Sequence, residues 1–142
     1  MANPLNAYRD NAILSASPAR LLTMLYDRLL LDLTYAKEAL DASDVATAGY
    51  RLRHAGDIIG ALAGSLKRDV WDGADGLFNL YMYVTSALIR ASIYRDAELV
   101  EECIGLMEPL REAWHQAADS LSAAPAWETN TGAETAEVVA IA

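Results

Sequence analysis

The 142-residue chain lacks the features that would place it outside the cell, in a membrane or in a disulfide-bonded scaffold. It has one cysteine, Cys103, so neither an internal disulfide nor a cysteine-based zinc site can form, and a reducing compartment is the simplest setting. No stretch approaches the roughly 18 uncharged apolar residues of a membrane-spanning helix, and no basic segment followed by an apolar run opens the chain. We therefore expect a cytoplasmic chain that does not insert into membranes.

Basic residues are also scarce. The chain has 11 Lys and Arg against 20 Asp and Glu, a formal net charge of -9. Because phosphate backbones attract clustered cations, this balance disfavours nucleic acid as a partner. There is no glycine-rich phosphate loop followed by Gly-Lys-Ser or Gly-Lys-Thr, so we predict neither nucleotide binding nor any other cofactor.

Apolar residues recur at steps of three and four along four segments, which predicts four helices. Ser17 followed by Pro18 is typical of a helix start, because the hydroxyl accepts from a free backbone N–H and proline suits the first helical position. The stripe that follows predicts a helix over 18–41. A second stripe predicts a helix over about 44–68.

Aspartate and glycine are dense in 69–76, which predicts a loop, and a third helix should follow it to about Tyr94. After a short break, Asp96 is placed to cap a fourth helix, whose apolar face continues to Leu121. Pro109 lies inside this helix. Because the apolar stripe stays in phase beyond the proline, we predict a bend rather than an end.

Four helices of similar length with short connections predict an all-α fold, an antiparallel up-and-down four-helix bundle. We place the bundle at 17–122, after an N-terminal leader at 1–16. Beyond it, at 123–142, the composition shifts to Ala, Thr, Glu and Gly, which predicts a flexible C-terminal tail.

A metal site is the main catalytic possibility to weigh in such a bundle. Glu112 and His115 have the Glu-x-x-His spacing with which ferritin-like bundles bind metal. A di-metal site needs a second such pair and further inward carboxylates, yet no Asp or Glu lies between Leu77 and Arg95. We therefore predict no metal ligands, interpret His115 as a surface residue, and expect the protein not to be an enzyme.

The first predicted helix carries more apolar residues than one stripe needs. Leu21, Met24, Tyr26, Leu30 and Leu31 lie outside its main seam. Either the rest of the domain or a bound partner covers them, and periodicity does not separate the two. Seven tyrosines against one phenylalanine favour a partner modestly, because a ring with a polar tip suits interfaces.

Two further patterns bear on a binding surface. Tyr81 and Tyr83 are two residues apart on a helix and point in different directions, so we predict one at the core and the other on a rim or binding surface. Gly56, Gly60 and Gly64 form a ridge spaced by four. Tight packing within the bundle is our favoured interpretation of this ridge, and a groove for a partner is the alternative.

The order of side chains along most of the chain also resembles one family. Matching positions in the second half are Leu77, Leu80, Tyr81, Tyr83, Arg90, Ala91, Asp96, Glu101, Glu102, Leu106, Leu110, Arg111 and Trp114. Matching positions near the start are Tyr8, Ser17, Pro18, Leu21, Leu22, Leu25 and Tyr26. On these residues the chain resembles the flagellin-specific export chaperones of bacterial flagella, the FliS family.

The resemblance implies a small antiparallel bundle that binds the disordered C-terminal segment of flagellin in the cytoplasm. Such a chaperone prevents premature polymerisation and keeps flagellin competent for flagellar type III secretion, and a component of the export gate is a further candidate partner. In the family the leader can lie over part of the client surface, so we expect the leader here, with Tyr8, to fold back over apolar surface and to be displaced by client.

The candidate client-binding residues combine family-matched apolar positions with others outside the minimal seam. They are Tyr8, Ile13, Leu21, Leu22, Leu25, Tyr26, Leu29, Leu80, Tyr81, Tyr83, Leu88, Leu106, Leu110 and Trp114. A helical adaptor or structural bundle for a different amphipathic helix is the alternative function. A metal-binding ferritin-like bundle is a more remote one.

Overall fold

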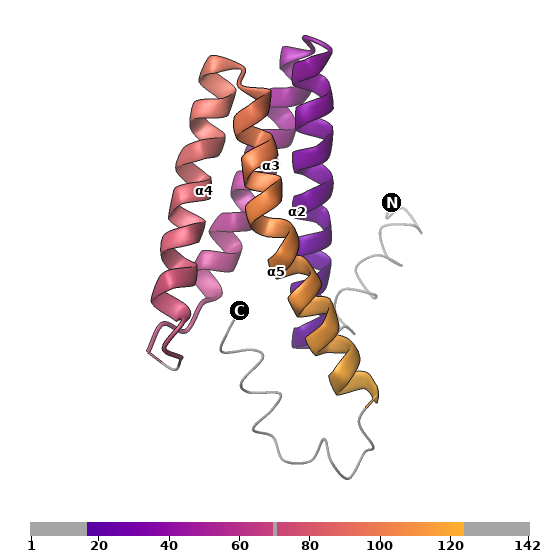
Figure 1. Cartoon of the computed structure of the whole chain (residues 1–142), viewed down its shortest axis with the longest axis vertical. Coiled ribbons are helices and arrows are strands. Elements are labelled where there is room, and N and C mark those ends of the chain that lie inside the picture. Colours follow the sequence, from indigo (N-terminus) through magenta and orange to yellow (C-terminus); the bar gives the residue numbers. More distant parts are fainter. Residues whose placement is uncertain (1–16, 70, 124–142) are drawn as a thin grey trace, which may run out of the picture.

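The computed structural model describes residues 17–69 and 71–123, so the predicted leader and nearly all of the predicted tail lie outside it. Within the described residues the chain forms four helices and no strand: α2 (Pro18–Asp41), α3 (Val45–Ser65), α4 (Ala74–Tyr94) and α5 (Ala97–Ala123). They lie side by side and alternate in direction (Figure 1). Each helix contacts the next, and α5 returns to contact α2. The predicted antiparallel up-and-down four-helix bundle is confirmed.

Helix starts follow the predicted capping chemistry. The Ser17 hydroxyl accepts from the backbone N–H of Arg20 at 3.1 Å, with Pro18 at the first helical position of α2. The Asp96 carboxylate accepts from the N–H of Leu99 at 3.1 Å and caps α5 as predicted. Asp44 caps α3 in the same way. These caps need only residues three apart in the chain, which is why the sequence shows them.

Two predicted boundaries were wrong by a few residues. The second helix ends at Ser65 rather than near 68, because the chain turns extended at Leu66, whose side chain is buried in the core. The third helix begins inside the predicted loop, at Ala74, which is also fully buried. In both places a contact with the core overrides the local signal.

Pro109 does not end the last helix. α5 continues through it to Ala123, and Figure 1 shows that α5 changes direction about midway along its length. The proline cannot donate a backbone hydrogen bond to the carbonyl of Gly105, and Gly105 lies on the exposed side of the helix, where water can replace that donor. The prediction of a continued helix is confirmed.

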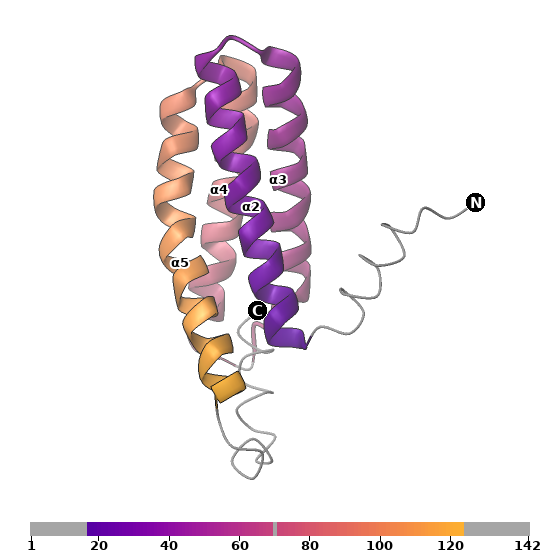
Figure 2. The same cartoon turned by 90° about the vertical axis from the view of Figure 1, so that its right-hand side faces the viewer.

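The core is built around α2, which lies between α3 and α5 in Figure 2, with α4 behind. This position explains the apolar surplus on α2, because a helix flanked on two sides is buried over a wide arc. Tyr26 is fully buried and Leu30 is 6% exposed, so the domain itself covers them, whereas Leu31 is 39% exposed. Cys103 is also fully buried, a small apolar core residue as interpreted from the sequence.

Tight packing at the glycine ridge was a wrong interpretation. Among the described residues, a methyl group built on Gly56, Gly60 or Gly64 would meet no atom within 4 Å beyond its own helix. The ridge on α3 therefore faces open space rather than a neighbouring helix. None of the described helices combines the length and the apolar character that crossing a membrane requires.

Candidate binding surface

Exposure divides the candidate client-binding residues into three groups. Buried in the core are Leu22, Tyr26, Leu29, Tyr81, Leu88 and Trp114. Half-buried are Leu21, Leu25, Leu80, Leu106 and Leu110, which we call the leucine rim. Tyr83 is exposed, and Tyr8 and Ile13 lie outside the described residues. In this conformation the leucine rim and Tyr83 are accessible to a partner, whereas the buried group is not.

The two neighbouring tyrosines of α4 separate as predicted. Tyr81 is fully buried, whereas Tyr83 is 41% exposed. The Tyr83 hydroxyl donates to the Glu102 carboxylate of α5 at 2.6 Å, and this hydrogen bond raises the pKa of the Tyr83 phenol. The bond ties the ring to α5, so Tyr83 presents an apolar surface in a defined orientation.

The buried residues include a polar aromatic cluster of Tyr26, Tyr81 and Trp114. The hydroxyls of Tyr26 and Tyr81 are 2.6 Å apart and link α2 to α4 across the bundle. The Trp114 ring of α5 lies against Tyr26 at a centroid separation of 6.3 Å, and its buried Nε1 has no hydrogen-bond partner among the described residues. Burial raises the pKa of both phenols, so both stay neutral over the physiological range. The cluster fixes three helices relative to one another.

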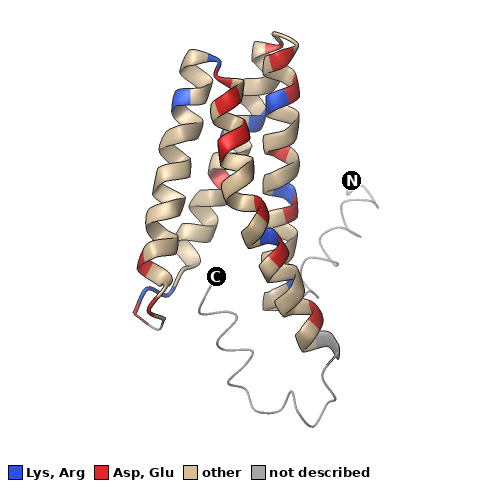
Figure 3. Ribbon diagram, in the orientation of Figure 1, with Lys and Arg blue, Asp and Glu red and all other residues tan. Residues whose placement is uncertain are grey.

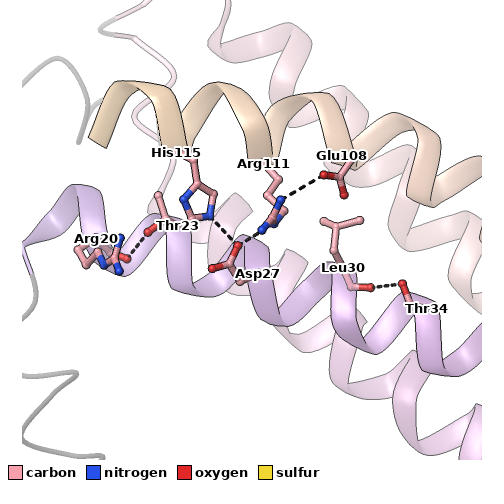
Figure 4. Close-up of polar contacts among 8 residues, drawn as sticks. All are labelled: Arg20, Thr23, Asp27, Leu30, Thr34, Glu108, Arg111 and His115. Carbon is pink, nitrogen blue, oxygen red and sulfur yellow. Dashed lines mark hydrogen bonds and ion pairs between the residues drawn. The ribbon is translucent and has the colours of Figure 1, made fainter. Parts of the chain in front are cut away.

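A second polar contact holds α2 against α5 (Figure 4). Asp27 accepts from Arg111 Nε at 2.7 Å and from His115 Nε2 at 2.6 Å, and Arg111 also contacts Glu108 at 3.2 Å. His115, which we interpreted as a surface residue, is half-buried: its side chain is 27% exposed and bonded to Asp27. The imidazole is thus directed towards Asp27 of α2.

A third contact holds α2 against α3. The Asp32 carboxylate is fully buried and is met by Arg51 Nη1 at 3.0 Å, by the His54 ring and, at 3.5 Å, by Arg28 Nε of its own helix. The Arg51 guanidinium also lies over the Tyr35 ring, 4.6 Å from its centroid. One buried carboxylate is thus surrounded by three basic groups, which compensate its desolvation.

Sequence reasoning missed both aspartates. One signal was available for Asp32, because it interrupts the run Leu29-Leu30-Leu31-Asp32-Leu33, where an unpaired charge would be costly. The local sequence pattern does not indicate which residues pair with either aspartate. Within residues 17–69 and 71–123, no group of three or more His, Cys, Asp or Glu side chains could hold a metal ion.

An open groove runs between α3 and α4. One part, of about 470 Å³, is lined by Leu52, Arg53, Gly56, Asp57, Thr85, Leu88, Ile89, Ser92 and Ile93. An adjoining part, of about 380 Å³, is lined by Leu40, Val45, Ala46, Ala48, Gly49, Leu52, Arg53, Ser92 and Arg95. Figure 3 shows that charge is sparse on α4, whose only charged residues are Asp75 and Arg90, whereas acidic residues run along α5. The α4 wall of the groove therefore carries little charge.

The bundle has the fold of a bacterial flagellar chaperone. A crystal structure described as a flagellar chaperone from bacteria matches it with a TM-score of 0.67 and 18% sequence identity. The match covers 83% of this chain and 99% of the solved chain.

The family follows from the sequence comparisons. The family model described as flagellar protein FliS matches residues 1–121, and the chain belongs to this family. The flagellar secretion chaperone FliS of Salmonella typhimurium (strain LT2) is 36% identical over 109 residues, 75% of this chain and 81% of that protein. The protein of the same name from Bacillus subtilis (strain 168) is 31% identical over 118 residues, 83% of this chain and 88% of that protein. The family is one of chaperones, which is not a class of enzymes.

Proposed function

We propose that this chain binds the C-terminal segment of flagellin in the cytoplasm, prevents its premature polymerisation and keeps it competent for flagellar type III secretion. The observation that carries the proposal is the match of the FliS family over residues 1–121. The fold supports it, because a bundle with half-buried apolar side chains on its surface can bind an amphipathic helix through its apolar face. A disordered client that folds on binding can offset its ordering cost by wrapping a large surface.

We assign the client contact to the leucine rim together with Tyr83. The rim draws on three helices, α2, α4 and α5, and four of its members pack against the core from the outside: Leu25, Leu80, Leu106 and Leu110. Each can therefore be covered further without moving the core. Tyr83 adds an exposed ring whose hydroxyl is already bonded to Glu102, so covering the ring leaves no polar group unpaired.

Isothermal titration with the C-terminal peptide of the same organism's flagellin tests the function, with circular dichroism of the mixture. We expect saturable one-to-one binding and a gain of helix. No heat and no gain of helix, with the bundle shown to be folded, would leave a helical adaptor for another partner.

The same titration tests the assigned surface. Tyr83→Ala should weaken binding at least about tenfold, as loss of a central aromatic contact does. Tyr94→Ala is the matched control, since Tyr94 is an exposed tyrosine of the same helix, 75% exposed and outside the leucine rim. Equal affinities of the two variants would remove Tyr83 from the client surface.

The leader is assigned a covering role. The first turns of α2, which follow the leader in the chain, contain Leu21 and Leu25 of the leucine rim. Deleting residues 2–14 should leave a folded bundle and strengthen peptide binding, because a competing segment is removed. A deletion variant that no longer folds would show that the leader belongs to the core.

A further inference from the structure

A patch of aromatic and basic side chains lies where α2 meets α3, and it shares no residue with the leucine rim. The Arg51 guanidinium lies 4.6 Å from the centroid of the Tyr35 ring and 5.8 Å from that of the Tyr50 ring. The Tyr50 ring in turn stacks on the His54 ring at a centroid separation of 6.4 Å. Arg28 of α2 meets the same buried carboxylate as Arg51 and His54. These five side chains form a surface that we call the arginine–tyrosine patch.

The arginine–tyrosine patch is accessible, although it surrounds a buried ion pair. Tyr35 is 40% exposed and Tyr50 is 53% exposed. Their hydroxyls form no hydrogen bond within the described part of the chain. One turn before Tyr35, the half-exposed Leu31 adds an apolar side chain on the same face of α2. The patch thus combines apolar surface with free hydroxyls, as binding surfaces for another segment do.

Positive charge prevails in the patch, although the chain as a whole has a net charge of -9. Two guanidinium groups, those of Arg28 and Arg51, meet one carboxylate, that of Asp32. The Arg28 side chain is 42% exposed, and its buried Nε makes no hydrogen bond with any described residue. Glu38 of α2 and Asp57 of α3 lie one turn beyond the patch, so the positive region is small. A segment that brings one or two carboxylates is complementary to it.

The chain has an acidic segment beyond the described residues. Residues 124–142 contain Glu128, Glu134 and Glu137 and neither lysine nor arginine. Glu137 is followed directly by Val-Val-Ala-Ile. The segment begins beyond residue 121, where the match to the family ends. Carboxylates next to apolar side chains are complementary to a patch in which guanidinium groups lie beside exposed rings.

The acidic segment is long enough to reach the patch. α5 continues for eight residues beyond His115, which meets Asp27 of the antiparallel α2. At about 1.5 Å per residue, Ala123 therefore lies about 12 Å beyond Asp27, in the direction away from Arg28. Because α2 lies between α3 and α5 (Figure 2), the path also crosses one helix, about 8–10 Å. Glu134 is eleven residues beyond Ala123, and eleven extended residues span up to about 36 Å, which exceeds this path.

We propose that residues 124–142 dock on the arginine–tyrosine patch of their own bundle. Glu134 and Glu137 contact Arg28 and the free tyrosine hydroxyls, and the apolar residues that follow cover Leu31 and the exposed rings. A weak contact is sufficient, because a tethered segment has an effective concentration of about millimolar. The inference does not depend on flagellin binding, since the client contact is assigned to the leucine rim and Tyr83.

A spin label on the acidic segment of the full chain tests the docking. In an Ala140→Cys variant the label reacts at residue 140, because Cys103 is fully buried. In NMR spectra the backbone amide signals of Tyr35 and Tyr50 should lose intensity while the label is active and regain it when the label is reduced. Tyr94 of α4 is an exposed tyrosine outside the patch, and its amide signal should not change. Equal losses at all three tyrosines, or no loss at any, would overturn the proposal.

Charge variants of the spin-labelled chain test which groups hold the segment. Glu137→Lys should abolish the loss of intensity at the two patch tyrosines, whereas Glu128→Lys, with the same change of net charge, should leave it in place. On the bundle, Arg28→Gln should reduce the loss, whereas Arg20→Gln, at an exposed arginine of the same helix, should not. Circular dichroism shows whether each variant is folded, and Glu137→Lys remains a test even if Arg28→Gln impairs folding. If folded Glu137→Lys or folded Arg28→Gln keeps the full loss, the proposal fails.

A mixed sample distinguishes docking within one chain from docking between two copies. Protein enriched in ¹⁵N and without the label is mixed with spin-labelled protein of natural isotope content, at the same total concentration. Docking within one chain predicts no loss of intensity at Tyr35 or Tyr50 in this mixture. A loss there would place the segment of one copy on the patch of another, and the proposal for a single chain would be wrong.

Discussion

Replacing Asp32 by asparagine is expected to lower the free energy of unfolding by about 2 to 4 kcal/mol. Asparagine has nearly the same shape, so no cavity forms and the change removes mainly the charge. The carboxylate is fully buried, and its loss leaves the three basic groups Arg28, Arg51 and His54 beside a neutral side chain. Removing one partner of a buried ion pair costs about 3–5 kcal/mol.

Partial exposure of the partners lowers that range. The Arg51 side chain is 23% exposed and the His54 side chain 37% exposed, so water can recover part of the lost interaction. A loss of 2 to 4 kcal/mol is a large share of the roughly 5–15 kcal/mol by which a typical domain is stable. The variant should therefore fold, with a clearly reduced stability.

Asp27→Asn provides a matched control. Asp27 also accepts from one arginine and one histidine on a neighbouring helix, but its side chain is 44% exposed and that of Arg111 is 34% exposed. Exposed pairs of this kind contribute about 1 kcal/mol or less. Both aspartates are thus paired with one arginine and one histidine of a neighbouring helix, and they differ in burial.

Urea unfolding followed by circular dichroism measures the loss of stability in both variants. With a slope of about 1–3 kcal/mol per molar urea, Asp32→Asn should lower the midpoint by roughly 1 to 2 M, and Asp27→Asn by well under half as much. If the two midpoints shift equally, burial does not set the cost and the reasoning is refuted.

Three further predictions concern the buried hydroxyls, the thiol and a helix cap. Burial raises the pKa of Tyr26 and Tyr81 above the ordinary 10.0, so the contribution of these neutral phenols to stability is complete below that value and is lost as pH rises through the higher folded pKa values. Replacing both tyrosines by phenylalanine should therefore reduce the loss of stability between about pH 9 and about pH 11, measured by urea unfolding. Burial raises the pKa of Cys103 to about 11, so its thiol should react with iodoacetamide at neutral pH only when the bundle unfolds, as mass spectrometry with and without urea would show. Asp96→Ala removes the cap of α5 and should cost about 1 kcal/mol in the same unfolding assay; an unchanged midpoint would show that the cap hydrogen bond contributes nothing.

The helices and their order were predictable because their determinants are local. The steps of three and four define an apolar stripe, and caps such as Ser17 and Asp96 act on residues three positions away. Pro109 was correctly placed inside a helix for the same reason, since the stripe on either side keeps its phase. The end of α3 at Ser65 and the start of α4 at Ala74 were missed, because core contacts of Leu66 and Ala74 decide them.

The candidate surface was predictable only in part. Family-matched positions and apolar surplus selected apolar residues, but they did not separate buried from half-buried ones. Tyr26 and Leu25 are neighbours in the chain, yet Tyr26 is fully buried and Leu25 half-buried, because α2 is flanked by α3 and α5. The Tyr81 and Tyr83 pair was an exception, since two residues on a helix point in different directions whatever the packing.

By itself the sequence determined four amphipathic helices, their caps, the acidic balance and the family, because periodicity, capping and residue order need no knowledge of distant contacts. Only the tertiary structure decided the partners of Asp27, which lie 84 and 88 residues away, and those of Asp32, 19 and 22 residues away on α3. It also reversed the interpretation of the glycine ridge, because a glycine spacing is the same whether the facing space holds a helix or is open. Which side of an amphipathic helix remains uncovered is a property of the assembled bundle.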